Sequence, residues 1–278
     1  MKTKLKIMLA LTLTFAACEK EQFVLISTET PNFRFNESMK WNKVHPERVI
    51  SVTTDDYSIL SVADCHVGTT KNLNSFFTRT KTNSFDAIVM NGDLTLGHDY
   101  DYDALEQCLP NRDSFPLFMI AGNHDIYFNG WKQYFARFGS STYTFTMKTP
   151  QVADLFICLD TSGGTLGDEQ LNWLEETLIA RRAGYRHCFV ITHNNLFRER
   201  HSTSTNPFVE ELKVLISLFT KYRVDMVITG HDHQKAESKF GVTRYIQLDA
   251  FHDAADNASY FKLNVKNEAV TYGFEKIK

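Results

Sequence analysis

Five short stretches of the sequence carry side chains that bind metal ions or move protons. They read DCH at 64–66, GD at 92–93, GNHD at 122–125, a lone histidine at 193 and GHDH at 230–233. The set combines carboxylates, imidazoles and one amide, which suits borderline divalent ions such as Mn²⁺, Fe²⁺, Zn²⁺ or Co²⁺. It is too rich in nitrogen for a Ca²⁺ site. One ion would not use so many ligands, so the set indicates two ions that share a carboxylate.

The spacing within two of these stretches favours a common direction for their side chains. Asp64 and His66 are two residues apart, and His231 and His233 share that spacing. In an extended backbone such pairs project to the same side. We therefore expect both members of each pair to face the same cleft.

Apolar runs of strand length precede the candidate ligands. Seven runs have this length, namely Ser58–Ala63, Ala87–Met90, Leu117–Ala121, Leu155–Leu159, Cys188–Thr192, Met226–Thr229 and Tyr245–Leu248. Five of them end just before a metal-capable side chain. In an open α/β sheet the carboxyl ends of the strands form the binding edge, so we expect residues far apart in the sequence to converge there.

Helical periodicity occupies two of the intervals between these runs. Asp168–Arg182 is one helix, and Pro207–Tyr222 is another, with Asn206 as its expected N-cap and Pro207 at its first position. Near the end of the chain, two strand-like segments flank the turn Lys266–Glu268 and predict an antiparallel hairpin. Strands that alternate with helices predict an α/β protein with a largely buried sheet.

Length and composition favour one domain with a full hydrophobic core. The chain has 278 residues, 43% of them hydrophobic, and a formal net charge of −3. It contains no stripe of lysine and arginine, so strong electrostatic capture of nucleic acid is not indicated. Four cysteines follow Cys18 without a CxxC pair, and the sequence assigns no disulfide.

The first residues have the pattern of an export signal. Lysines at 2, 4 and 6 precede an apolar stretch over 7–17, which is too short to span a bilayer comfortably. The sequence FAAC that ends at Cys18 resembles the lipobox of bacterial lipoproteins. This resemblance implies removal of residues 1–17, a lipid on Cys18, and an exported protein anchored to a membrane on its periplasmic side or at the cell surface. An ordinary secretory signal is the alternative.

Residues 18–56 are interpreted as a tether and N-terminal extension, in which Pro31 and Pro46 are expected to interrupt helices, and residues 57–278 as the main domain.

Taken in order, the five stretches resemble the motifs of the calcineurin-like metallophosphoesterases, D-x-H, G-D, G-N-H-[DE], a lone His and G-H-x-H. The resemblance covers about residues 57–275. It implies a sandwich of two mixed β-sheets flanked by helices, in the order α/β/β/α. It also implies a ligand set in which Asp64, His66 and His233 bind one metal ion, Asp93 bridges, and Asn123, His193 and His231 bind the other. His124 is implied to face the substrate, and Asp125 to orient its surroundings, so that His124 and Asp93 are the expected catalytic residues.

Such a centre predicts hydrolysis of a phosphate ester. Two adjacent cations lower the pKa of a bridging water and neutralise charge on the phosphoryl group. A phosphodiester and a phosphomonoester both remain open, with nucleotides and cyclic nucleotides among the small substrates. Leu96 stands where purple acid phosphatases have a tyrosine, and GDLTLGH lacks the Asp-Arg pair of protein phosphatases, so the pattern is nearer to cyclic-nucleotide phosphodiesterases. The alternatives are a nuclease-type phosphodiesterase and a non-catalytic surface lipoprotein with a structural metal site. The sequence does not indicate an oligomeric state.

Several polar residues on neighbouring loops could contact a substrate without binding metal. They are Asn194, the pair His98 and Asp99, and the pair His252 and Asp253.

Overall fold

The structure is a computed structural model that describes residues 29–81, 85–112, 115–198 and 205–277. The predicted signal peptide and Cys18 lie outside the described residues. Among the helices in these four ranges, none combines the length and apolar character that spanning a bilayer requires.

Twelve strands of the described residues form two mixed sheets. The seven-stranded sheet has the order β1 (Arg48–Ser51), β5 (Tyr143–Lys148), β6 (Ala153–Leu159), β7 (Cys188–Thr192), β8 (Met226–Thr229), β10 (Thr243–Gln247) and β9 (Ala236–Phe240). Strands β6, β7, β8 and β10 run parallel, whereas β5 pairs with β6, and β9 with β10, in the antiparallel sense.

The five-stranded sheet has the order β12 (Ala269–Lys276), β11 (Ser259–Lys266), β2 (Asp56–Val62), β3 (Ala87–Asn91) and β4 (Leu117–Ile120). Its strands β2, β3 and β4 are parallel, and the hairpin of β11 and β12 adds to the other side of β2 in the antiparallel sense. The predicted hairpin around Lys266–Glu268 is therefore confirmed.

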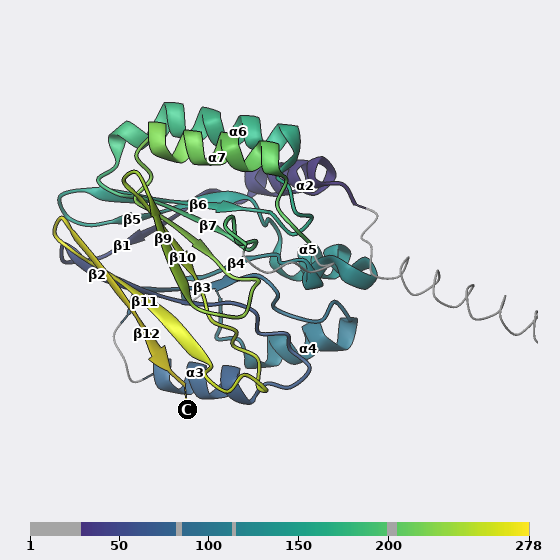
Figure 1. Cartoon of the computed structure of the whole chain (residues 1–278). Helices are drawn as coiled ribbons and strands as arrows, with labels where there is room; N and C mark the ends of the chain where they lie inside the picture. Colours follow the sequence, from purple (N-terminus) through teal and green to yellow (C-terminus); the bar gives the residue numbers. More distant parts are fainter. Residues whose placement is uncertain (1–28, 82–84, 113–114, 199–204, 278) are drawn as a thin grey trace, which may run out of the picture.

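The two sheets pack face to face and helices cover their outer faces, as Figure 1 shows. Side chains such as Ile59, Phe145, Phe156 and Phe189 fill the space between the sheets. Successive residues of a strand point to opposite faces, and Leu60, next to Ile59, accordingly belongs to the core under the helices. Both faces of each sheet are thus buried over most of their area.

The helices divide between the two outer faces. Helices α3 (Lys71–Thr80), α4 (Asp99–Cys108) and α5 (Gly130–Phe138) contribute to the core on the five-stranded sheet. Helices α6 (Gly167–Arg181) and α7 (Val209–Lys221) pack on the seven-stranded sheet. Two short 3₁₀ segments complete the set, η1 (His124–Asn129) and η2 (Arg182–Gly184). The α/β/β/α order predicted above is confirmed.

Residues 31–51, within the predicted tether and N-terminal extension, are folded onto the main domain. Helix α2 spans Pro31–Val44 and contacts α6, and β1 forms an edge of the seven-stranded sheet. Pro31 does not break this helix because it occupies the first turn, where a backbone N–H has no intrahelical acceptor. Thr30 is the N-cap, and its hydroxyl accepts a hydrogen bond from the N–H of Phe33 at 3.2 Å.

Helix α7 begins later than predicted. It starts at Val209, after Phe208 as N-cap, and no side-chain hydrogen bond caps it. Asn206 and Pro207 are therefore not its N-cap and first residue. The side-chain oxygen of Asn206 instead accepts a hydrogen bond from Arg198 at 2.6 Å, which withdraws it from the helix terminus.

Candidate metal centre

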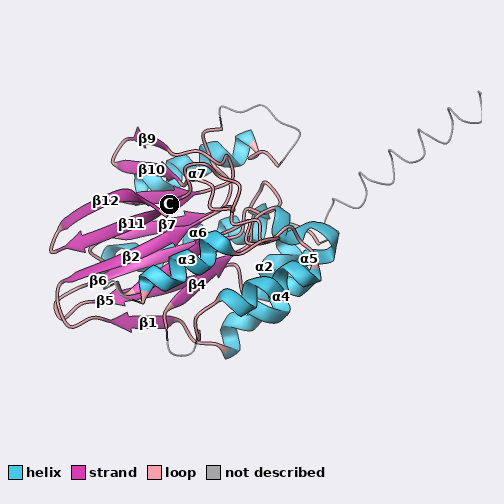
Figure 2. Cartoon of the chain, turned by 90° about the horizontal axis from the view of Figure 1, so that it is seen from below, coloured by secondary structure: helices cyan, strands magenta, loops and turns pink. Residues whose placement is uncertain are grey.

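The loops that follow five strands meet at one end of the sandwich. The strand ends of β2, β3 and β4 come from one sheet and those of β7 and β8 from the other. Seen from below the five-stranded sheet, the loops gather at one end of the strands (Figure 2). Direct hydrogen bonds tie these loops together, from the Asp64 N–H to the Gly92 carbonyl at 3.0 Å and from the Gly230 N–H to the His193 carbonyl at 2.8 Å.

Six of the seven predicted ligands form two clusters of metal-capable atoms. One cluster contains Asp64, His66, Asp93 and His233, and the other contains Asp93, His193 and His231. Asp93 belongs to both, and it is only 1% exposed. A carboxylate shared in this way can bridge two cations.

The first cluster brings two imidazole nitrogens and two carboxylates to a common point. The Nε2 atoms of His66 and His233 are 3.0 Å apart. Asp64 Oδ1 lies 3.4 Å from His233 Nε2, and Asp93 Oδ2 lies 3.6 Å from His66 Nε2. Donor atoms this close, on four different loop positions, fit the mixed nitrogen and oxygen coordination of a transition-metal ion.

The second cluster is built around the other oxygen of Asp93. Asp93 Oδ1 lies 3.3 Å from His193 Nε2. The Nδ1 atom of His193 is 3.0 Å from the Asn91 carbonyl, which fixes the ring and leaves Nε2 to face Asp93. His231 is held similarly, with its Nε2 2.9 Å from the carbonyl of Thr205.

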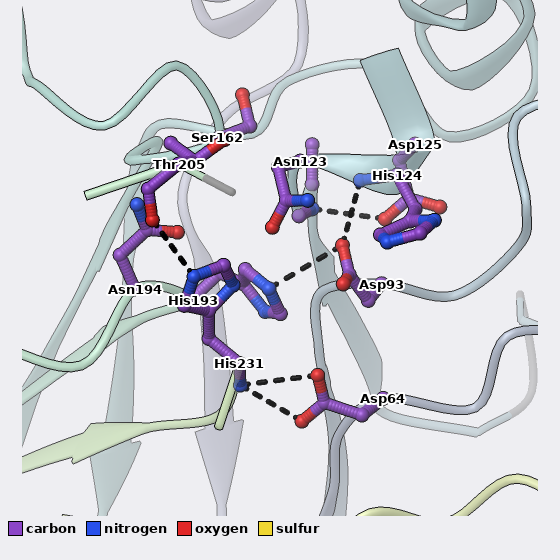
Figure 3. Close-up of polar contacts among 12 residues, drawn as sticks. Asp64, Asp93, Asn123, His124, Asp125, Ser162, His193, Asn194, Thr205 and His231 are labelled. Atoms are coloured by element: carbon purple, nitrogen blue, oxygen red, sulfur yellow. Dashed lines mark hydrogen bonds and ion pairs between the residues drawn. The ribbon is translucent and has the colours of Figure 1, made fainter. Parts of the chain in front are cut away.

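Buried atoms without hydrogen bonds test whether this second cluster fits a metal. Among the described residues, neither Asn123 Oδ1 nor His231 Nδ1 has a hydrogen-bond partner. Figure 3 shows the Asn123 side chain on the same side of the site as Asp93 and the two histidine rings. Leaving a buried polar atom unpaired is costly. An ion that accepts these lone pairs would satisfy both atoms, so the residues fit the predicted group.

The backbone at the ligand positions is not extended. The expectation that an extended backbone directs the side chains of Asp64 and His66, and of His231 and His233, to the same side is therefore wrong. The φ angles of Asp64, His66, His231 and His233 are 53°, 41°, 81° and 59°, and that of Asp93 is 49°. Left-handed φ values are uncommon for residues other than glycine. The common direction of the paired side chains thus comes from turns directly after the strands, and the strain is concentrated at the site.

Gly92 makes room for His193. Its φ is 80°, and a Cβ atom built there would lie 2.5 Å from His193 Nδ1. Only a residue without a side chain permits this approach between the loop after β3 and the end of β7.

Asp125 orders the turn that carries Asn123 and His124. Its carboxylate accepts hydrogen bonds from the N–H groups of Leu94, Thr95 and Gly122 at 2.9–3.0 Å and from the Thr95 hydroxyl at 3.1 Å. Burial, together with the negative charge of Asp93, raises the pKa of Asp125 to about 7 against these four donors. The predicted orienting role of Asp125 agrees with this network.

The histidines of the two clusters have pKa values shifted in opposite directions. Burial lowers the pKa of His66 and of His231 to about 4, so both rings are neutral near pH 7. Burial also opposes a charge on His193, but the carboxylate of Asp93 outweighs it and raises the pKa of His193 to about 10. The same contact with His193 holds the pKa of Asp93 far below its usual range, although burial acts in the opposite direction.

His124 lies at the edge of the centre. Its backbone N–H donates to Asp93 Oδ1 at 2.8 Å, and its ring is 4.5 Å from the His66 ring between centroids. Burial lowers the pKa of His124. The residue is thus attached to the shared carboxylate through its backbone, while its side chain is not part of either cluster.

The family model for calcineurin-like phosphoesterases matches residues 57–235. The chain belongs to this family. Two curated relatives are similar to it. A probable cyclic nucleotide phosphodiesterase of Vesicomyosocius okutanii is 26% identical over 197 residues, which cover 66% of this chain and 82% of the relative. Another from Ruthia magnifica is 27% identical over 202 residues, covering 67% and 82%. The predicted class, a metal-dependent phosphoester hydrolase, is confirmed.

Solved structures share the fold of this phosphoesterase. A dimetal phosphatase from Danio rerio superposes with a TM-score of 0.63 at 12% identity, over 80% of this chain and 96% of that one. GAP50, the anchor in the inner membrane complex of Plasmodium, gives 0.65 at 14% identity, over 81% and 86%. At these identities the likeness shows the fold alone.

The other polar residues named from the sequence fall in different places. His252 lies near the phosphoesterase centre, with ring centroids 6.0 Å from His66 and 5.5 Å from His233. Asp253 instead caps α3, accepting from the N–H groups of Lys71 at 2.9 Å and Asn72 at 2.6 Å.

Asn194 and His98 also differ in their surroundings. The side chain of Asn194 is buried beside His193 and His231 (Figure 3), and neither of its polar atoms has a hydrogen-bond partner in the part of the chain that the structure describes. His98 stacks between Tyr100 and Phe128, with centroid distances of 5.1 and 4.2 Å. Asp99 is the first residue of α4.

Three supporting contacts were not predicted from the sequence. Tyr127 accepts a hydrogen bond from the Asn123 amide at 3.0 Å through its hydroxyl, which leaves Oδ1 of Asn123 available. The carbonyls of Asn91 and Thr205 hold His193 and His231. The contact of Tyr127 with Asn123 could have been predicted, because the two residues are four apart in the sequence. The contacts of the Asn91 and Thr205 carbonyls could not, because every residue type has a backbone carbonyl.

Proposed function

We propose that this chain hydrolyses a small phosphodiester with two divalent transition-metal ions. Asp93 would bind both ions. The remaining ligands would divide between the two clusters, with Asp64, His66 and His233 on one side and Asn123, His193 and His231 on the other. Manganese, iron, zinc and cobalt all suit this donor set.

The observation that carries this proposal is the position of Asp93 in both clusters, with one oxygen toward His66 and the other toward His193. Two ions in such a centre supply a hydroxide nucleophile near neutral pH and neutralise charge on the phosphoryl group. The protein fixes the ligands in advance, through the Asn91 carbonyl on His193 and the Thr205 carbonyl on His231. Because the ligand side chains are already fixed, they would align the nucleophile with the phosphorus atom without moving during the reaction.

His124 is the residue that we assign to the substrate. Its backbone hydrogen bond to Asp93 places the imidazole next to the first cluster without making it a ligand. In this position it would donate a hydrogen bond to a phosphoryl oxygen or a proton to the leaving alkoxide. A bound phosphate carries negative charge, which favours the protonated imidazole and opposes the effect of burial on the pKa of His124.

A diester is preferred over a monoester because the two curated relatives are named as probable cyclic nucleotide phosphodiesterases. Cyclic nucleotides are therefore the first substrates to test. We further propose that the mature protein is an exported lipoprotein anchored through Cys18, and that the domain described here acts on small substrates outside the cytoplasm.

The test measures metal content and turnover together. The purified domain, starting after Cys18, should bind about two ions per chain and hydrolyse bis(4-nitrophenyl) phosphate or a cyclic nucleotide when Mn²⁺ is supplied. Asp93→Asn should reduce both ion binding and turnover by at least about a hundredfold. Asp168→Asn is the matched control, because that exposed carboxylate at the start of α6 belongs to neither cluster. Full turnover in Asp93→Asn would contradict the mechanism.

Two other outcomes point to the alternatives. Metal binding without turnover on a broad panel of phosphate esters would indicate a structural metal site. Hydrolysis confined to DNA or RNA, with salt-dependent binding, would indicate a nuclease.

A further inference from the structure

A cavity of about 1000 Å³ lies on the side of the sandwich where β4, the edge of one sheet, faces β1 and β5 at the edge of the other. The C-terminal part of α2, together with Trp173, Thr177 and Arg181 of α6, completes its walls. Within the described ranges, no residue of either metal cluster lines it. A cavity of this size is large enough for a cofactor-sized ligand.

The floor of the cavity is apolar and its mouth is polar. Leu117, Phe118 and Phe138 are buried residues of the floor, whereas His45 and Glu47 at the mouth are exposed. This arrangement would shield the body of a ligand from water and leave one end close to solvent. It is the usual design of a site for a small organic molecule.

Aromatic side chains dominate the walls. Trp41 at the end of α2 and Trp173 on α6 both line the cavity and are half-buried. Tyr143 of β5 and Phe118 of β4 also line it. Flat rings in such number favour a flat partner, because aromatic groups gain from offset stacking and edge contacts beyond the area they bury.

Three arginines of the described residues line this cavity, Arg48, Arg112 and Arg181. Arg112 contributes a guanidinium that lies 5.2 Å from the Phe138 ring centroid and donates one hydrogen bond, to the Arg137 carbonyl at 2.8 Å. A guanidinium has five N–H donors, and no carboxylate among the described residues pairs with Arg112. Arg48, over the ring of Phe118, adds a second positive charge.

Glu47, the one carboxylate among the described residues of the lining, does not offset Arg112. Glu47 accepts hydrogen bonds from Arg181 at 2.7 and 2.9 Å and from the hydroxyls of Thr144 and Thr146 at 2.8 and 2.6 Å. The negative charge of Glu47 is paired with Arg181, so the other residues of the lining carry a net positive charge. An acid group near Arg112 would gain a charge-assisted hydrogen bond.

We propose that this cavity is a second ligand site, separate from the metal centre, for a small organic anion with an aromatic body. The rings of the ligand contact the Trp173 side chain and the edges of the Trp41 and Phe118 rings, whose faces are covered by His45 and Phe145, and its acid group pairs with Arg112. The site does not depend on the proposed hydrolytic function.

The test uses 8-anilinonaphthalene-1-sulfonate, a fluorescent aromatic anion, as the probe. Two of the three tryptophans of the chain line the cavity, so saturable binding should transfer excitation energy from tryptophan to the probe. N-phenyl-1-naphthylamine, which has the same rings and no charge, should bind about tenfold more weakly, since a hydrogen bond between charged groups contributes about that factor.

Three variants locate the binding. Arg112→Met should weaken sulfonate binding about tenfold and leave the neutral probe unchanged. Thr177→Phe, which projects a ring from α6 into the cavity, should remove the binding of both probes. Arg79→Met, on α3 and away from the cavity, is the matched control and should behave like the parent protein. Far-UV circular dichroism and the thermal midpoint of each variant establish that it is folded.

Each of three results would overturn the proposal. They are the absence of saturable probe binding, equal affinity for the charged and neutral probes, and unchanged binding in a folded Thr177→Phe protein. Asp93→Asn separates this site from the metal centre. The proposal expects that variant to bind the sulfonate as the parent does, and loss of binding there would place the anion at the metal centre instead.

Discussion

Oδ2 of Asp125 accepts a hydrogen bond from the backbone N–H of Gly122 at 2.9 Å, across the turn that presents Asn123 and His124. Because the same carboxylate also binds the loop after β3 through Leu94 and Thr95, it fixes two motif loops relative to each other. In Asp125→Asn, either orientation of the amide sets an NH₂ group against a backbone N–H. We expect a loss of about 1–3 kcal/mol in the free energy of unfolding, measured by urea denaturation, and a lower kcat at saturating metal. Asp256→Asn, at an exposed position, should change neither quantity.

Gly92→Ala should damage the centre without removing a ligand. The added methyl would collide with the His193 ring, and the φ of 80° is unfavourable for alanine. We expect a destabilisation of about 2–4 kcal/mol and a reduced metal content by atomic spectroscopy. Gly273→Ala is the control, since a Cβ there meets nothing within 4 Å. Full metal occupancy in Gly92→Ala would show that the loop after β3 is free to move away from His193.

Metal binding should release at least about one proton per chain near pH 7, from His193, in addition to the proton that a metal-bound water loses. Ligands must be deprotonated to bind a metal. His66 and His231, each with a pKa of about 4, are already neutral, whereas His193, with a pKa of about 10, is protonated beside Asp93. Titration calorimetry in two buffers of different ionisation enthalpy counts the protons. A count near zero would place His193 in the neutral form before the metal binds.

The ion pair between Glu47 and Arg181 should stabilise the folded protein only at pH values at which the Glu47 carboxylate is deprotonated. Burial tends to raise the pKa of Glu47, but the hydrogen bonds from Arg181, Thr146 and Thr144 lower it overall from its ordinary value of 4.5. A depressed pKa in the folded state means that the contribution is present above pH 4.5 and is lost as the pH falls through the lower, folded value.

Glu47→Gln measures this contribution. At pH 7 the variant should be less stable by up to about 1 kcal/mol, because the pair is partly exposed and screened by solvent. The difference should shrink as the pH is lowered below 4.5, as followed by urea denaturation at a series of pH values. A difference that stays constant with pH would assign the effect to packing instead of charge.

The sequence predicted the strands and their ends well, for a physical reason. Runs such as Cys188–Thr192 and Met226–Thr229 are buried on both faces, so they appear as continuous apolar segments with polar residues at their boundaries. Strands β1, β5 and β9 were not predicted. In β9 every residue of Ala236–Phe240 is exposed, so this strand has no apolar pattern.

The errors at helix ends came from two opposite interpretations of proline, because Pro207 was expected to be the first residue of a helix that begins at Val209. Pro31 was interpreted as a helix breaker, although the pair Thr30–Pro31 is a typical N-cap and first residue. The contacts of His193 with the Asn91 carbonyl and of His231 with the Thr205 carbonyl could not be predicted from the sequence. Thr205 is 26 residues from His231 in the chain, and its carbonyl could have belonged to any residue type.

The left-handed backbone at Asp64, His66, Asp93, His231 and His233 has a consequence for how this protein can change. Each such position opposes folding by about 1 kcal/mol relative to glycine, so glycine at His66 or His233 would relieve backbone strain, whereas at Asp64 or Asp93 it would also remove buried hydrogen bonds that the carboxylate accepts. Directed selection for heat resistance alone should therefore erode the centre, and selection under metal limitation should erode it faster.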